Sequence, residues 1–129
     1  MYAFENLLGF IGSIFMALIL ICAGLPLLNG LIKKNPFYGY YLSKDGLNHD
    51  TVWYPVNRKG GLHLVVIGSF LALNALVALY FFRNLEAQLM IIRINLYLVG
   101  IGLIYSVIRT ASYSQKLSLM THKTKKRQT

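Results

Sequence analysis

The most reactive side chains in this sequence are three histidines and one cysteine, and their spacing is not that of a reactive or metal-binding site. His49, His63 and His122 are scattered, and no two have the spacing of zinc ligands. Cys22 lies inside a long apolar run, where we expect it to pack as a small buried hydrophobic side chain. The chain has no glycine-rich phosphate loop, no Gly-x-Ser-x-Gly motif and no paired carboxylates in an apolar run. We therefore predict no enzymatic activity, no cofactor and no metal, and interpret His49 and His63 as polar groups at headgroup level.

The composition is that of a membrane protein. Of the 129 residues, 56% are hydrophobic and 13% are charged, which is about half the charged share of a soluble domain. The net charge is +9, and the basic residues sit at the ends of apolar runs, as in membrane proteins. A nucleic-acid-binding domain would instead carry a basic patch on a polar surface. We predict membrane lipids as partners and no nucleic acid.

Three apolar runs predict three transmembrane helices, at about 7–28, 62–82 and 87–108. The first two contain no charged residue. The third includes Arg93, which could snorkel to the interface; a start at 94 would leave a run too short to cross untilted. The predicted fold is therefore an all-α membrane protein with a three-helix membrane domain at 1–116. The basic tail at 117–129 is predicted to be a partly disordered arm, whose first turns could continue the third helix.

The polar segment at 33–61 joins the first two helices and is predicted to be an interfacial loop with a short helix. Asn48 or Asp50 would cap this helix, which would run through Trp53 and bend at Pro55. Aromatic side chains beside basic residues in this loop are typical of a chain at headgroup level, although they could also form a ligand cage. These aromatic residues are Phe37, Tyr38, Tyr40 and Tyr41.

Small residues recur at helical spacing along the second predicted helix. Gly61, Gly68, Ala72 and Ala75 form a stripe that lets another helix approach closely. Asn74, in the middle of the helix, would seek a hydrogen-bond partner across a helix interface.

The distribution of basic residues predicts the topology. The 33–61 loop holds five Lys or Arg residues and the segment from Arg109 onward holds six, against Arg83 and Arg93 on the other side. This bias predicts a cytoplasmic loop and C-terminus and an external N-terminus. The basic terminus could bind anionic lipid or could serve as a topology signal alone. The predicted headgroup contacts are Lys33, Lys34, Arg58, Lys59, Lys125, Lys126 and Arg127.

The loop and the helix after it resemble the signature of the SdpI family of small bacterial membrane proteins. The pattern is Asn, three residues, Gly-aromatic, then Trp, three residues, Asn, three residues, Gly, and a further Gly within the next helix. Here these positions are Asn35, Gly39, Tyr40, Trp53, Asn57, Gly61 and Gly68. The match covers roughly 7–82, and the third helix fits only in position. Family members commonly have Arg-Thr where this chain has Tyr41-Leu42.

The resemblance implies a bacterial inner-membrane protein that gives immunity to a secreted antimicrobial peptide and, in the founding type, relays its binding to a membrane-held repressor. The retained motif spacing favours this function. Tyr41-Leu42 favours the alternative, a structural accessory subunit of a larger membrane complex. The predicted partner beyond lipid is thus a peptide toxin or a neighbouring membrane subunit.

Overall fold

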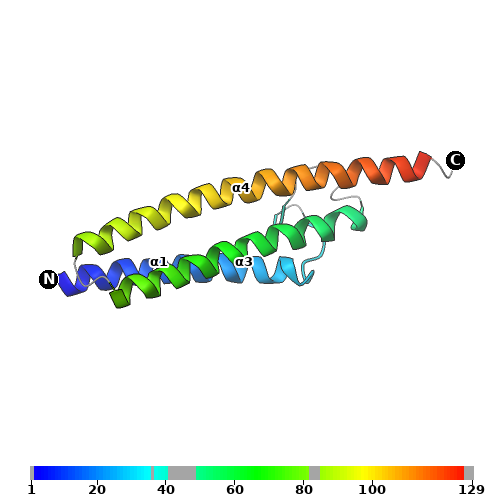
Figure 1. Cartoon of the computed structure of the whole chain (residues 1–129). Coiled ribbons are helices and arrows are strands. Elements are labelled where there is room, and N and C mark those ends of the chain that lie inside the picture. Colours follow the sequence, from blue (N-terminus) through cyan, green and yellow to red (C-terminus); the bar gives the residue numbers. More distant parts are fainter. Residues whose placement is uncertain (1, 36, 41–48, 82–84, 127–129) are drawn as a thin grey trace.

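Three long helices make up nearly all of the described chain in the computed structural model, which describes residues 2–35, 37–40, 49–81 and 85–126. They are α1 (Tyr2–Leu28), α3 (Asp50–Phe81) and α4 (Leu85–Lys126), and no strand occurs in those ranges. The helices lie side by side along one long axis (Figure 1). Each contains a stretch long and apolar enough to cross a bilayer: Gly9–Leu28, Asp50–Tyr80 and Glu86–Thr121. The predicted fold is confirmed: this is the architecture of a multi-pass membrane protein.

Helix α3 begins well before the predicted second span. The carbonyl of His49 accepts hydrogen bonds from the backbone N–H groups of Val52 and Trp53 at 3.0 Å, which starts the helix. It then continues unbroken through Pro55, so the predicted short helix is not a separate element but forms the first turns of α3. Proline removes one hydrogen bond from the second turn. The helix tolerates this loss because Trp53 and Val56, on either side of the proline, are 1% and 2% exposed and are held by tertiary packing.

Helix α4 extends far beyond the predicted third span. Its 42 residues correspond to about 63 Å at 1.5 Å per residue. Ser106, Thr110 and Ser114 are buried at intervals of four residues, so one face of α4 stays packed past position 108. The helix continues to Lys126, where the sequence suggested only a few turns; 127–129 lie outside the described residues.

Helices α1 and α3 approach each other closely through small residues. A Cβ atom added to Gly61 would lie 2.6 Å from the carbonyl oxygen of Gly24, and one added to Gly68 would lie 2.8 Å from that of Ala17. Ala75 is buried, and Ala72 packs against the core cluster that contains Ala17. In a bilayer, such packing substitutes for the hydrophobic effect as the force between helices.

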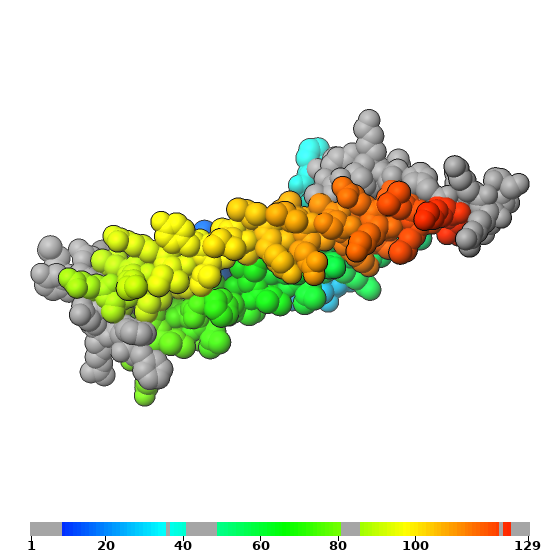
Figure 2. All heavy atoms as spheres, turned by 45° about the horizontal axis from the view of Figure 1, so that its top comes forward, coloured from blue at the N-terminus to red at the C-terminus, as the bar shows by residue number. Residues whose placement is uncertain are grey.

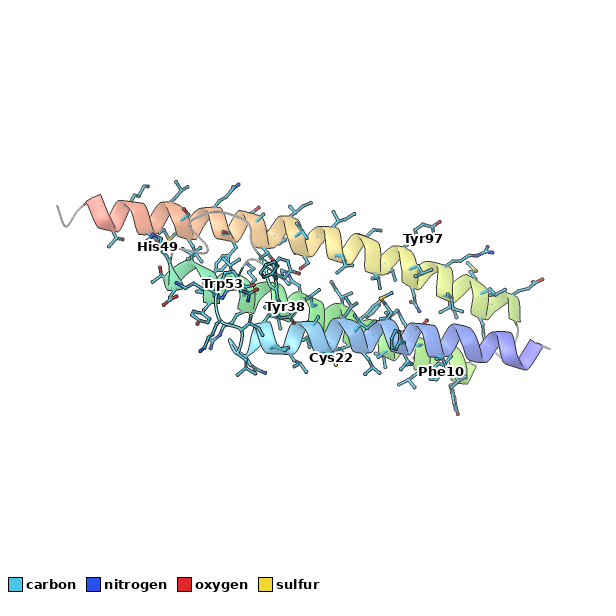
Figure 3. The ribbon with its side chains drawn as sticks, turned by 180° about the vertical axis from the view of Figure 1, so that it is seen from behind. Phe10, Cys22, Tyr38, His49, Trp53 and Tyr97 are labelled. Atoms are coloured by element: carbon cyan, nitrogen blue, oxygen red, sulfur yellow. The ribbon has the colours of Figure 1, made fainter. Side chains whose placement is uncertain are left out.

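The outward faces of the helices carry large apolar side chains suited to lipid. Tyr97 of α4 is 74% exposed and Phe15 of α1 is 64% exposed. Cys22 is also exposed, contrary to the expectation that it is buried, because it lies two residues from both Leu20 and Gly24 and therefore on the opposite face of α1 from these buried residues. Both Cys22 and Tyr97 point away from the other helices in Figure 3.

Candidate functional site at the loop end of the helices

Asn57 fixes the described part of the loop onto α3. Its side chain is 3% exposed. Its Oδ1 accepts a hydrogen bond from the backbone N–H of Tyr40 at 2.6 Å, and its Nδ2 donates to the carbonyl of Trp53 at 2.9 Å. Both ends of the amide therefore bond to backbone, one in the loop and one in the helix. This explains chemically why an asparagine, with a donor and an acceptor on one short side chain, stands at this position.

Gly39 lets the loop pass directly over Asn57. Its φ of 124° lies in a region that favours glycine. A Cβ there would lie 2.5 Å from the Oδ1 of Asn57 and 3.2 Å from the Trp53 ring. The Trp53 indole N–H donates to the carbonyl of Ile32 at 3.3 Å, so the buried tryptophan also holds the chain that leaves α1. Figure 3 shows Trp53 and Tyr38 at this end of the molecule.

Asn35 shapes the start of the same loop segment. Its Oδ1 accepts hydrogen bonds from the backbone N–H groups of Phe37 at 3.0 Å and Tyr38 at 2.7 Å, and its Nδ2 donates to the carbonyl of Lys33 at 2.8 Å. This is the side-chain turn that asparagine favours. Asn35 and Asn57 thus determine the backbone on either side of Gly39. The departure from the family pattern at Tyr41-Leu42 lies outside the described residues.

Tyr40 reaches across to α4, where sequence reasoning identified no partner. Its hydroxyl lies 2.9 Å from the Oγ of Ser106, and Nδ1 of His63 lies 3.2 Å from the same oxygen. The Tyr40 ring passes over Gly60, where a Cβ would lie 2.2 Å from it. The Ser-x-x-x-Thr-x-x-x-Ser spacing at 106–114 was the available signal in the sequence for a polar face on α4.

A shallow, wide-open recess of about 440 Å³ lies beside the loop, between α1, α3 and α4. The hydroxyl of Tyr38 donates to the carbonyl of Ala23 in α1, while that of Tyr40 is engaged with Ser106. Burial raises the pKa of the Tyr38 hydroxyl, which keeps it protonated as a donor. Because both hydroxyls have partners, the surface is mainly aromatic and aliphatic. Its lining comprises Ala23, Leu27, Tyr38, Tyr40, Leu64 and Val107, with Gly39 at the edge.

The predicted headgroup residues divide into four groups. Lys34 forms an ion pair with Asp50 at 2.8 Å, which ties the loop to the start of α3. Lys59 lies over the ring of Tyr113, 4.4 Å from its centroid. Lys33 and Arg58 are exposed. Lys125 and Lys126 are in α4, but their side chains, like all of Arg127, lie outside the described residues.

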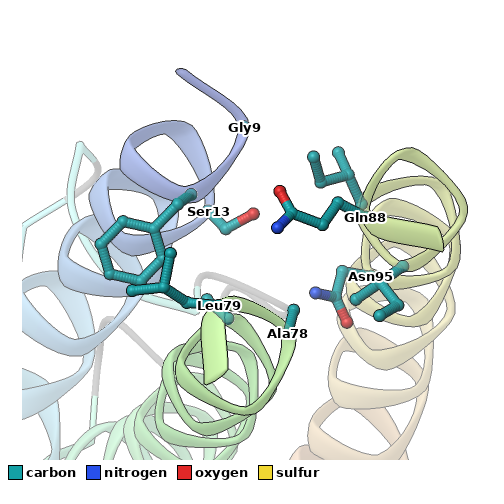
Figure 4. Close-up of a pocket in the computed structure, with 10 residues that line it drawn as sticks. Gly9, Ser13, Ala78, Leu79, Gln88 and Asn95 are labelled. Atoms are coloured by element: carbon teal, nitrogen blue, oxygen red, sulfur yellow. The ribbon is translucent and has the colours of Figure 1, made fainter. Parts of the chain in front are cut away.

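A second polar site lies at the opposite end of the helices. Asn74 has the cross-helix partner that its position predicted: its Nδ2 donates to Oδ1 of Asn95 in α4 at 3.3 Å. Asn95 and Gln88 are buried, and with Ser13 of α1 they point into a shared space (Figure 4). The cavity there measures about 20 Å³, enough for a single water molecule. Sequence reasoning singled out neither Gln88 nor Asn95.

Comparisons of the chain with protein-family models, with curated proteins and with solved structures found no match.

Proposed function

We propose that this protein is a non-enzymatic binding protein of a bacterial inner membrane, of the SdpI immunity type, which protects the cell from a membrane-active peptide. The observation that carries this proposal is the recess of about 440 Å³ beside a loop that motif residues hold in place. In the proposed orientation the loop and the C-terminus are cytoplasmic and the N-terminus is external, because the basic residues gather on the loop side.

The chemistry of the recess suits an apolar side chain of an amphipathic peptide. Its walls come from all three helices, and its rim is aromatic. The rim is also preorganised, because Asn57 and Ser106 hold Tyr40 at its backbone and its hydroxyl. A preorganised surface loses little conformational entropy when it binds.

A binding function also fits the burial of Ser106, which with His63 forms the polar pair that most resembles a catalytic one. Ser106 and His63 are within hydrogen-bond distance, an arrangement that could activate a nucleophile. However, Ser106 is fully buried and its oxygen also contacts Tyr40. A substrate would therefore have no approach to it, and the pair is better explained as a structural link between α3, α4 and the loop.

A killing assay tests this function. Sensitive bacteria expressing the protein are challenged with membrane-active peptides secreted by competing strains, and we expect survival with at least one of them. Val107→Trp, which fills the recess, should abolish protection at equal expression. Val77→Trp is the matched control, because Val77 is exposed on α3 outside the recess. The peptide-immunity function would be refuted if the Val107→Trp variant still protected the cells. It would also be refuted if the wild-type protein protected them from none of the tested peptides.

The predicted orientation has its own test. A C-terminal green fluorescent protein should fluoresce and a C-terminal alkaline phosphatase should be inactive, because the former matures in the cytoplasm and the latter outside it. The reverse pattern would place the loop and its recess on the external side.

The alternative, an accessory subunit, is favoured by one specific observation. A groove of about 260 Å³ runs between α1 and α4, and a Cβ on Gly12 at its edge would meet nothing within 4 Å. A helix of a neighbouring subunit could pack there. Mild-detergent extraction from the native host, followed by native sizing and mass spectrometry, separates the two functions. Co-migration with a large complex in fixed stoichiometry would favour the subunit, whereas a small homo-oligomer would favour immunity.

A further inference from the structure

A lipid-facing groove between α3 and α4 is lined mainly by apolar side chains near Gly102. It measures about 200 Å³ and is lined by Leu62, His63, Val66, Ile67, Gly102 and Tyr105. Gly102 lets α4 approach Ile67 of α3 closely at the floor of this groove, since a Cβ there would lie only 3.2 Å from Ile67 Cδ1. Figure 2 shows α4 lying along α3 over much of the molecule.

The groove continues along the same pair of helices. A second hollow of about 220 Å³ shares Val66 and Ile67 with the first and extends to Phe70 and Leu98. From Tyr105 to Leu98, α4 rises about 10 Å. This length and apolar lining match the part of an acyl chain next to a lipid headgroup.

Two cations stand at the mouth of the groove. Lys59 lies one turn before His63 on α3, and Arg109 lies one turn after Tyr105 on α4. The rings of His63 and Tyr105, which both line the groove, have centroids 6.0 Å apart and planes tilted by 49°. Both cations therefore lie one turn beyond residues that line the groove, one on each of the two helices that form it.

Aromatic rings hold both cations in place, but no carboxylate among the described residues neutralises their charge. Lys59 lies over Tyr113, 4.4 Å from the ring centroid, and Arg109 lies over Tyr105 at 5.7 Å. Within the described part of the chain, neither is in an ion pair. A cation–π contact orients a cation yet leaves its charge available to an anion. Two such charges beside an apolar groove are complementary to a negatively charged headgroup with an acyl chain.

We propose that this groove binds one anionic phospholipid, with the phosphate between Lys59 and Arg109 and an acyl chain along Gly102 toward Leu98. Two cations favour a headgroup with net negative charge over a zwitterionic one, whose choline would meet like charge. The site is separate from the recess beside the loop, so its test does not depend on peptide immunity.

Native mass spectrometry of the purified full-length protein in detergent tests the headgroup half of the site. The protein is titrated with phosphatidylglycerol or with phosphatidylcholine of the same acyl chains. We expect phosphatidylglycerol to bind about tenfold more tightly, and the double variant Lys59→Gln/Arg109→Gln to lose this preference. The matched control, Arg93→Gln/Lys123→Gln, removes the same charge elsewhere and should keep it. Equal binding of both lipids by the wild type, or equal loss in the control, would overturn the proposal.

Substitutions at two glycines test the part of the site that would hold the acyl chain, without changing the charge of the protein. Gly102→Leu should reduce phosphatidylglycerol binding severalfold, whereas Gly100→Leu should not, because a Cβ at Gly100 meets nothing within 4 Å. Circular dichroism and elution volume verify the fold of each variant. If the double variant does not fold, the single variants Lys59→Arg and Lys59→Gln replace it, and the former should retain binding while the latter weakens it. Unchanged binding in Gly102→Leu would also refute the site.

Discussion

The polar side chains at the two ends of the helical unit have different kinds of hydrogen-bond partner. At the loop end, Asn57 bonds to two backbone groups, and a Cβ on Gly61 would collide with backbone atoms of α1. At the opposite end, Asn74 meets another side-chain amide at 3.3 Å. A Cβ on Gly9 there would meet the tip of Ile92, and one on Gly12 would meet nothing.

This difference indicates which end can adapt. Side-chain contacts can be relieved by a change of rotamer, whereas contacts with backbone require whole segments to move. The loop end is therefore a fixed framework suited to preorganised binding. The opposite end, with its cavity of about 20 Å³, can rearrange around water or a neighbouring helix.

The largest effect is expected from Gly61→Leu. Its Cβ would lie 2.6 Å from both the oxygen of Gly24 and the nitrogen of Leu28, so α1 and α3 must separate. We expect a loss of about 3 kcal/mol in the free energy of unfolding, measured by SDS titration in mixed micelles. Gly12→Leu, at the adaptable end, should change it by less than about 0.5 kcal/mol. Similar losses in the two variants would contradict the difference between the ends.

Asn57→Leu should have the next largest effect. The variant leaves the backbone N–H of Tyr40 without its acceptor in a partly buried place, at a cost of about 2 kcal/mol. The same SDS titration measures the loss, and limited proteolysis should cut the loop faster than in the wild type. Loop cleavage at the wild-type rate would show that Asn57 does not hold this segment.

Gly39→Ala probes the same framework from the loop side. The methyl group would lie 2.5 Å from the Oδ1 of Asn57 at a φ of 124°, which we expect to cost about 1–2 kcal/mol. Combined with Asn57→Leu, its additional cost should be small, because the two changes break one contact. A double-variant cycle measures this coupling, and full additivity would argue against it.

A smaller effect than that of the three loop-end substitutions is expected from Asn74→Leu. Hydrogen bonds between side chains within membranes contribute about 0.6 kcal/mol on average, and Asn95 can turn toward the cavity beside it. The SDS titration should therefore give a loss below about 1 kcal/mol. A loss as large as that of Asn57→Leu would show that the opposite end is a fixed framework as well.

The helical architecture and the small-residue contact between α1 and α3 were predictable from sequence. Apolar runs of sufficient length directly indicate transmembrane helices. A Gly/Ala stripe such as Gly61 to Ala75 indicates that another helix approaches closely. The same holds for the existence of a partner for Asn74, since an amide within a membrane requires one.

What escaped prediction depends on tertiary contacts. The local effect of a proline predicts a bend in the helix at Pro55. Helix α3 nevertheless continues through this position, because the residues next to the proline are buried. Ser106 is an ordinary serine in the sequence, and its role depends on Tyr40 arriving from a loop 66 residues away in the chain. Asn95 could not be paired with Asn74 until the register of α4 against α3 was known.

The unbroken length of α4 gives the molecule a mechanical property. Its 42 residues contain no proline, so the helix behaves as a stiff rod of about 63 Å, roughly twice the hydrocarbon thickness of a bilayer. In Figure 1 its last turns run past the start of α3. A tilt of about 5° at the Leu85 end therefore displaces the Lys126 end by about 5 Å. Small rearrangements at the Leu85 end are therefore amplified at the basic tip that extends past the start of α3.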